Sequence, residues 1–312
     1  MRIVFMGTPD AAMPSLRRLL DDRHEIIAVW TQPDRPAGRG AKLHQSPVKE
    51  FALEHGLTIH QPTKIKTPEA RELFASHRAD ATVVVAYGRI LPAGFLDAQR
   101  HGCINVHFSL LPKYRGAAPV NWAIVNGEKE TGVTTMRIIS ELDAGPIYRQ
   151  SATEIGGSET APELMQRLAI TGSDLLSETL KAIDRLEPKP QRVQDATFAP
   201  MLKREDGLID WTMDAVALER RVRGFQPWPN AYSTLHSRRL IIRQAAAELL
   251  QQPSIQPGQI VEAQGDRLLV ACGGGTALRL LDIQAEDARR MSARDFLNGA
   301  HLKIGHRLGR ED

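Results

Sequence analysis

Short apolar runs alternate with segments of helical periodicity in the first half of the chain. The apolar runs cover residues 3–6, 25–31, 82–86 and 102–108. After the first run, Leu16, Leu19 and Leu20 recur at the spacing that places them on one face of a helix. Apolar strands that are continuous rather than alternating are typical of a parallel sheet with helices on both faces. The pattern therefore predicts an α/β domain with a Rossmann-like, doubly wound, mostly parallel sheet.

Two further strand-like runs, residues 131–139 and 146–154, complete this predicted domain. Thr160 and Glu163 then have the spacing of a capping box, which predicts the start of a long helix. The prolines in residues 187–190 end that helix, because proline cannot continue it. We therefore expect a first domain over residues 1–187 and a linker over residues 188–207.

The pattern changes after the predicted linker. A short helix over residues 214–223 ends at Gly224, and several short strand-like runs separated by turn residues follow it. These runs lie near residue 232 and over residues 240–243, 259–262, 268–271 and 277–283. Regularly spaced short strands predict a small β-barrel, similar to an OB-fold, over residues 208–312.

Composition narrows the class of protein only slightly. The net charge of +3 permits an anionic partner without identifying one. The two cysteines, Cys103 and Cys272, lie far apart, and no cluster of metal-binding residues accompanies them, so we expect no metal site. No apolar run is long enough for a signal peptide or a membrane span. These features predict a cytoplasmic protein without a membrane partner.

The strand at residues 102–108 carries the strongest candidate chemistry. Asn105 and His107 are two positions apart, so both point to one face at the carboxyl end of a strand, where open α/β sheets bind ligands. An asparagine amide can stabilise an oxyanion, and a histidine can exchange a proton near neutral pH. Asp143, close to Gly145, is a candidate to orient the imidazole. A buried structural histidine and a turn-forming aspartate explain the same residues, and are more common.

Two loops could contact substrates. The apolar loop formed by Ser109, Leu110, Leu111 and Pro112 suits one wall of a pocket for a flat ligand. The segment 32–49 is basic, and prolines and glycines between residues 33 and 40 lead us to expect no regular structure there. Its cations are Arg35, Arg39, Lys42 and Lys49, and its only acid is Asp34. Such a segment can bind phosphates, although a merely solvated loop is the simpler interpretation.

Arginines also cluster in the second domain. They are Arg220, Arg221, Arg223, Arg238, Arg239 and Arg243. A barrel with a basic groove is a common nucleic-acid platform, and a solvated surface explains the cluster equally well. In the first domain, the turn that begins at Gly7 lacks the glycine spacing of dinucleotide-binding proteins, which disfavours an NAD-dependent oxidoreductase.

Several motifs resemble the folate-dependent formyltransferases. They are Asn105-Val-His107-Phe-Ser-Leu-Leu-Pro112, Arg115-Gly116-Ala-Ala-Pro119, Gly132-Val-Thr134 and Leu142-Asp143-Ala-Gly145. The resemblance implies that Asn105, His107 and Asp143 are catalytic and that the loop from Ser109 to Pro112 contacts folate. One departure is Phe108, where we expect a small residue or proline, and this change could reshape the pocket.

Further segments resemble the methionyl-tRNA formyltransferase family in particular. They cover residues 5–10, 31–40, 46–49, 85–92, 209–211 and 225–229. This resemblance implies transfer of formyl from 10-formyltetrahydrofolate to the amino group of methionyl initiator tRNA, for translation initiation, without a metal or an obligate protein partner. The implied folate-binding residues are Tyr87, Gly88, Ile90, Leu91, Ser109, Leu110, Leu111 and Pro112, and the implied tRNA-binding residues are Arg35, Arg39 and Lys42.

Two alternatives stay open at this point. A sugar-nucleotide N-formyltransferase would share the three catalytic residues and the loop after His107, but would not need the basic segment or a tRNA-binding barrel. A non-catalytic RNA-binding protein could keep the same fold, although the intact trio of Asn105, His107 and Asp143 argues against it.

Overall fold

The computed structural model describes residues 1–37, 42–250 and 255–309. The chain forms two compact units, which are described separately below. The first unit comprises Met1–Pro119, Glu130–Glu154 and Met165–Ala199. The second comprises Val120–Lys129, Ile155–Leu164 and Pro200–Asp312.

A seven-stranded sheet forms the centre of the first unit, with the strand order β10-β9-β7-β6-β1-β2-β5. Its strands are β1 (Arg2–Gly7), β2 (Glu25–Trp30), β5 (Ile59–His60), β6 (Ala81–Val85), β7 (Cys103–His107), β9 (Glu130–Arg137) and β10 (Ile147–Glu154). The strands β7, β6, β1, β2 and β5 are parallel to one another. Strand β9 runs antiparallel to β7, and β10 runs antiparallel to β9. The predicted doubly wound, mostly parallel sheet is thereby confirmed.

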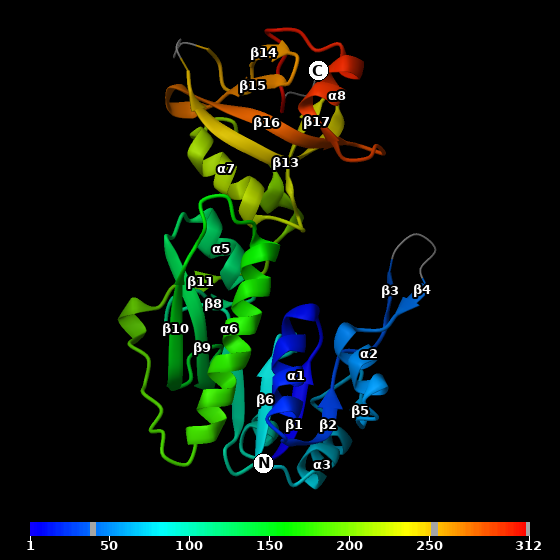
Figure 1. The fold of residues 1–312 in the computed structure, drawn as a ribbon, viewed down its shortest axis with the longest axis vertical. Helices are drawn as coiled ribbons and strands as arrows, with labels where there is room; N and C mark the ends of the chain where they lie inside the picture. Colours follow the sequence, from blue (N-terminus) through cyan, green and yellow to red (C-terminus); the bar gives the residue numbers. More distant parts are fainter. Residues whose placement is uncertain (38–41, 251–254, 310–312) are drawn as a thin grey trace. The chain divides into compact units, whose positions relative to one another are not determined.

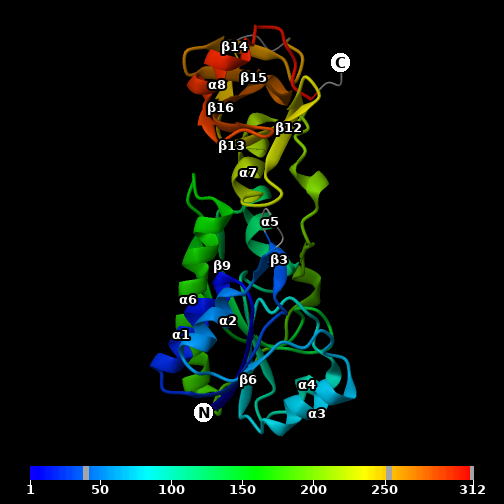
Figure 2. The same ribbon diagram turned by 90° about the vertical axis from the view of Figure 1, so that its right-hand side faces the viewer.

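Helices cover both faces of this sheet (Figure 2). One face carries α1 (Met13–Asp21), α2 (Pro47–Glu54) and α6 (Ala161–Ala182), and the other carries α3 (Pro68–Ser76) and α4 (Ala93–Leu96). Trp30, Phe74 and Phe95 form an aromatic core beneath α3 and α4, with Phe74 and Phe95 stacked at 4.0 Å between ring centroids. The predicted cap of α6 is confirmed, since the Glu163 carboxylate accepts the Thr160 N–H at 2.8 Å. No helix in the described ranges combines the length and apolar character of a membrane span.

The strand order reverses between β1 and β6, which is the kind of position at which doubly wound sheets bind ligands. The carboxyl ends of these strands, at Gly7 and Val85, lie side by side in register. His107 is the last residue of β7, which pairs in parallel with β6. His107 therefore lies at the same carboxyl edge of the sheet.

The basic segment contains regular structure, contrary to the expectation that its prolines and glycines would prevent it. Strands β3 (Arg35–Ala37) and β4 (Lys42–His44) form an antiparallel pair (Figure 1). In a two-stranded ribbon each strand is an edge, so Pro36 can be accommodated without losing a bond inside a sheet. At the base of this pair, Lys49 donates to Asp34 at 2.5 Å, and this bond lowers the pKa of the Asp34 carboxyl.

The segment proposed as a linker carries structure of its own at its start. Strand β11 (Phe198–Ala199) pairs in parallel with β8 (Arg115–Gly116). Further back, Lys189 and Ile147 exchange two main-chain hydrogen bonds of 2.8 Å. Residues 189–199 are therefore held against β8 and the start of β10, within the first unit.

An antiparallel sheet with the order β12-β13-β16-β15-β14 organises the second unit. Its elements are α5 (Pro119–Val125), α7 (Ala215–Gly224), β12 (Ala231–Leu235), β13 (Arg238–Leu249), β14 (Ile260–Gln264), β15 (Arg267–Ala271), β16 (Thr276–Ala285), β17 (Met291–Ser292) and α8 (Ala293–Ala300). The C-terminal segment forms main-chain hydrogen bonds with both edge strands, β14 and β12. The Ile260 N–H donates to the His306 carbonyl at 2.8 Å, and the Gly309 N–H donates to the Thr234 carbonyl at 2.9 Å. The C-terminal segment therefore links the two edges of this sheet, and the predicted β-rich second domain is confirmed as an antiparallel sheet.

Helix α5 is grouped with the second unit although it precedes the predicted linker by many residues. The Trp122 and Phe225 rings meet edge to face at 5.7 Å, and the Asn121 amide donates to the Gly224 carbonyl at 2.7 Å. A division at residue 188 would separate these partners, which sequence periodicity could not reveal.

Candidate active site

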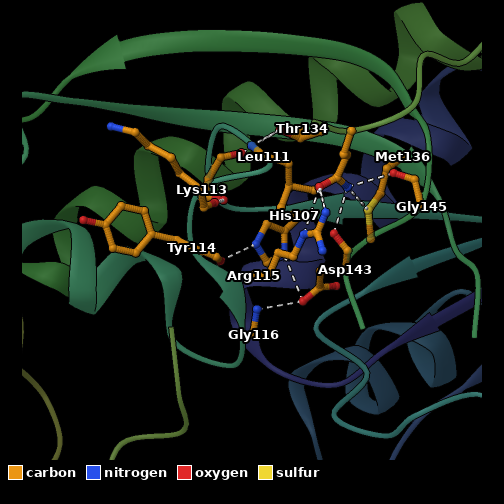
Figure 3. Close-up of polar contacts among 12 residues, drawn as sticks. His107, Leu111, Lys113, Tyr114, Arg115, Gly116, Thr134, Met136, Asp143 and Gly145 are labelled. Atoms are coloured by element: carbon orange, nitrogen blue, oxygen red, sulfur yellow. Dashed lines mark hydrogen bonds and ion pairs between the residues drawn. The ribbon is translucent and has the colours of Figure 1, made fainter. Parts of the chain in front are cut away.

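The imidazole of His107 is held by one hydrogen bond to the main chain (Figure 3). Nε2 lies 2.9 Å from the carbonyl oxygen of Tyr114, and His107 is only 6% exposed. Because a carbonyl oxygen can only accept, Nε2 carries the proton of this bond. Nδ1 is therefore the nitrogen left for chemistry, and it faces Asp143.

The Asp143 carboxylate lies beside His107 without bonding to it directly. Its Oδ2 is 3.8 Å from Nδ1 of His107, which exceeds hydrogen-bond distance. The same oxygen accepts the Gly116 N–H at 2.9 Å (Figure 3). We expected Asp143 to orient the imidazole, but no direct hydrogen bond joins the two side chains. The hydrogen bond from Nε2 to the Tyr114 carbonyl fixes the orientation of the ring instead. The carboxylate is near enough to interact electrostatically with a ring protonated at Nδ1.

The turn that presents Asp143 has an unusual backbone. Asp143 has φ +49°, in the left-handed region that aspartate tolerates better than most residues. Gly145 is required on steric grounds, because a Cβ there would overlap the Arg137 carbonyl oxygen. The Gln191 amide also contacts this turn by donating to the carbonyls of Asp143 and Gly145, each at 2.8 Å. Sequence reasoning missed Gln191, because no local pattern links residues so far apart.

Asn105 occupies the position two residues before His107 on β7, so strand alternation gives both the same face. Its side chain is half-buried, and among the described residues its amide has no hydrogen-bond partner. A half-buried amide without a partner in the protein is available to a substrate oxygen. The other face of β7 packs under α6, where a Cβ at Gly172 would lie 2.8 Å from Val106 and 3.7 Å from Phe108. Phe108 thus points away from the face of Asn105 and His107.

The loop after His107 is held from below by two strands. The Thr134 hydroxyl donates to the Ser109 carbonyl at 2.7 Å and accepts the Leu111 N–H at 3.1 Å. Gln150 donates to the Leu111 carbonyl at 2.8 Å. Ser109 and Leu111 are buried, whereas Leu110 and Pro112 are partly exposed. The Gly132-Val-Thr134 motif therefore supports this loop, and Leu110 and Pro112 are the members that a ligand can reach.

The second predicted folate segment is divided in the same way. Tyr87 and Leu91 are buried in the core of the sheet, and burial raises the pKa of the Tyr87 phenol. Ile90 is 65% exposed and Gly88 is also exposed, with φ +80°. The Tyr87 carbonyl accepts the Gln32 amide at 3.0 Å, which anchors the segment. Only Gly88 and Ile90 of these four residues present themselves at the surface.

The predicted tRNA-binding residues lie in or beside the β3–β4 pair. Arg35 is exposed on β3, and Lys42 begins β4. Arg39 lies outside the described residues. These three cations therefore belong to one short segment of the first unit.

Several arginines of the second unit are engaged within the protein. The Arg239 guanidinium lies 4.0 Å over the Tyr232 ring, and Arg243 donates to Asn230 at 2.6 Å. Arg223 pairs with Glu219 at 2.5 Å. These contacts give part of the arginine cluster a structural explanation. Within the described ranges, no group of three or more His, Cys, Asp or Glu side chains could hold a metal ion.

Comparison with known proteins identifies the family. Residues 1–180 match the formyl transferase family model, and residues 201–301 match the formyl transferase C-terminal domain. Methionyl-tRNA formyltransferase from Methylococcus capsulatus is 49% identical over 312 residues, covering 99% of this chain and 100% of that protein. Methionyl-tRNA formyltransferase from Citrifermentans bemidjiense is 47% identical over 315 residues, covering 100% of this chain and 98% of that protein.

A solved structure supports the fold. HypX from Aquifex aeolicus in complex with tetrahydrofolic acid superposes with a TM-score of 0.65 and 17% identity, covering 100% of this chain and 48% of that chain. This chain thus spans about half the length of HypX. The sugar-nucleotide alternative has less support, because the full-length relatives above are methionyl-tRNA formyltransferases. The chain therefore belongs to the formyl transferase family, and within it to the methionyl-tRNA formyltransferases.

Proposed function

We propose that this protein transfers the formyl group of 10-formyltetrahydrofolate to the α-amino group of methionyl initiator tRNA, for translation initiation. The observation that carries the proposal is the meeting of His107 and Asp143 at the carboxyl edge of the sheet. Asn105 is on the same strand as His107, and the chain matches methionyl-tRNA formyltransferases along its whole length.

The proposed reaction proceeds through a tetrahedral intermediate. The amine nitrogen of the methionyl group attacks the formyl carbon, and the carbonyl oxygen gains negative charge. The Asn105 amide and a proton on Nδ1 of His107 stabilise this oxyanion. The C–N bond to folate then breaks, while the proton lost by the attacking amine passes to the departing folate nitrogen.

Asp143 has two roles in this mechanism. Its charge balances a protonated His107 ring at 3.8 Å, and its free oxygen can accept the amine proton during transfer. The Gly116 N–H keeps Oδ2 in place while this happens. The Tyr114 carbonyl holds the opposite side of the ring, so that Nδ1 continues to face the reacting atoms.

Each substrate has a proposed binding region. Folate lies against Leu110 and Pro112 on one side and Gly88 and Ile90 on the other, where these residues are accessible. The tRNA contacts the β3–β4 segment through its acceptor end. It also contacts residues 208–312, which we propose as the tRNA-binding domain, after a catalytic domain over residues 1–187 and a linker over residues 188–207.

A direct assay tests this function. The protein is incubated with 10-formyltetrahydrofolate and either methionyl initiator tRNA or an amino-sugar nucleotide, and the formylated product is identified by mass. We expect formylation of the methionyl-tRNA alone. Formylation of the sugar nucleotide alone would instead establish the alternative function.

Replacement of Arg39 by alanine tests the role of the basic segment. A guanidinium can hold a phosphate through two parallel hydrogen bonds, so its loss should raise KM for methionyl-tRNA by about tenfold. The dependence of log(kcat/KM) on log salt concentration should become shallower by about one unit, since one phosphate contact is lost. Rates over a salt series measure both effects.

Arg71→Ala is the matched control, since Arg71 is an exposed arginine on α3. It should leave the tRNA kinetics and the salt dependence unchanged. Identical salt dependence for Arg39→Ala and the wild type would show that the segment is merely solvated.

A further inference from the structure

The side-chain amide of Gln191 joins two parts of the candidate active site. Its Nε2 donates to the carbonyls of Asp143 and Gly145, each at 2.8 Å. Its Oε1 accepts from Nε and Nη2 of Arg115 at 3.0 and 2.8 Å. A guanidinium only donates and a carbonyl only accepts, so these partners leave the amide one orientation.

Arg115 is itself fixed at this position. It is 3% exposed, and its remaining Nη1 donates to Glu141 at 3.2 Å. The residue that follows it, Gly116, donates its N–H to the Asp143 carboxylate. The pair Arg115–Gly116 therefore holds Asp143 twice, through the carboxylate directly and through the main chain by way of Gln191.

The turn at Asp143 needs such an external contact. Its left-handed backbone, with φ +49°, is less favourable for residues other than glycine. Inside the turn, the hydrogen bond from Ala144 N–H to the Glu141 carbonyl is long, at 3.4 Å. The two short bonds from Gln191 therefore supply much of the restraint on the main chain that carries the carboxylate.

Gln191 in turn is positioned by the chain on either side of it. Lys189 exchanges two main-chain hydrogen bonds with Ile147 at 2.8 Å, and the Thr197 carbonyl accepts the Arg115 N–H at 2.9 Å. The side chain is partly buried between these anchors. A segment anchored on both sides gives the amide a defined position against the turn.

We propose that Gln191 is a positioning residue for formyl transfer, which holds Asp143 at the distance from His107 that catalysis requires. The inference rests on the proposed catalytic role of Asp143. A carboxylate that is not in hydrogen-bond contact with the imidazole depends for its place on its own backbone and on the Gly116 N–H. A displacement of about 1 Å in such a group can reduce a rate by about a hundredfold.

Two substitutions at Gln191 separate positioning from folding. Gln191→Met keeps the length of the side chain and removes its four hydrogen bonds to Arg115 and to the turn at Asp143, together with the contact from Nε2 to the Met136 sulfur at 3.9 Å. Gln191→Glu keeps the acceptor for Arg115, and so the fold around that buried guanidinium, but cannot donate to the turn. Both variants should lower kcat by about tenfold to a hundredfold, while KM for folate and for methionyl-tRNA stays within about twofold.

A double-mutant cycle with Asp143→Asn provides the decisive measurement. If Gln191 acts through Asp143, then Gln191→Glu should lower kcat by less than about threefold once the carboxylate is gone. Equal losses in both backgrounds would overturn the proposal, as would a kcat for Gln191→Glu equal to that of the wild type.

The same cycle distinguishes failure of the proposed mechanism. Full activity of the single variant Asp143→Asn would refute the catalytic role of the carboxylate, whatever Gln191 does. Gln194→Met is the matched control, because Gln194 is exposed in the same segment. It should keep the wild-type kcat, and a loss equal to that of Gln191→Met would assign the effect to the segment as a whole and overturn the proposal.

Discussion

Replacement of His107 by asparagine should lower kcat for formyl transfer by about a hundredfold to ten-thousandfold, the range of general acid–base groups. Asparagine can still donate a hydrogen bond near the Tyr114 carbonyl, which His107 contacts at 2.9 Å. It cannot carry an exchangeable charge at the position of Nδ1, which faces Asp143 at 3.8 Å. Single-turnover formylation with saturating substrates measures the chemical step without product release.

Folate binding and thermal stability are the controls for this variant. Leu110 and Pro112, rather than the imidazole, form the accessible part of the loop, so the Kd for folate should change by less than about threefold. A rate close to that of the wild type, with an unchanged fold, would remove His107 from the mechanism.

Replacement of Asn105 by leucine should lower kcat by about a hundredfold to a thousandfold, as expected for loss of an oxyanion donor. The side chains have similar volumes, so the substitution mainly removes the hydrogen-bond donor. Among the described residues the Asn105 amide has no partner, so its loss leaves no buried protein group unsatisfied. Stability should therefore be kept while activity falls.

Thermal unfolding and steady-state kinetics of Asn105→Leu should be measured on the same preparation. If the role of Asn105 were structural, the result would be the opposite, with a lower Tm and a kcat near that of the wild type. Asn121→Leu is a useful comparison, because that amide donates to the Gly224 carbonyl at 2.7 Å and its loss should lower Tm.

The elements with strong local periodicity could be predicted from the sequence alone. Continuous apolar runs mark β1, β2, β6 and β7 because both faces of these strands are buried. The capping box at Thr160 and Glu163 marks the start of α6, since its partners lie within one helical turn. The fold class and the family followed from such local signals, and both are confirmed.

The candidate site was predictable only where its residues are neighbours in sequence or carry a family motif. Asn105 and His107 lie on one strand, so alternation alone assigns them one face. The motif around Asp143 indicated a third member, but the 3.8 Å separation and the role of the Tyr114 carbonyl required coordinates. Two of the residues expected to contact folate, Tyr87 and Leu91, are buried in the core. Their burial also depends on tertiary packing and could not be predicted from the sequence.

Tertiary structure alone decided the features that depend on partners distant in sequence. The β3–β4 pair forms despite its proline because a ribbon of two edge strands can accommodate one. Helix α5 is grouped with the second unit because Trp122 meets Phe225 there. Gln191 meets the turn at Asp143 in a segment that also pairs with β8 through β11, and local periodicity carries no information about hydrogen bonds between residues so far apart.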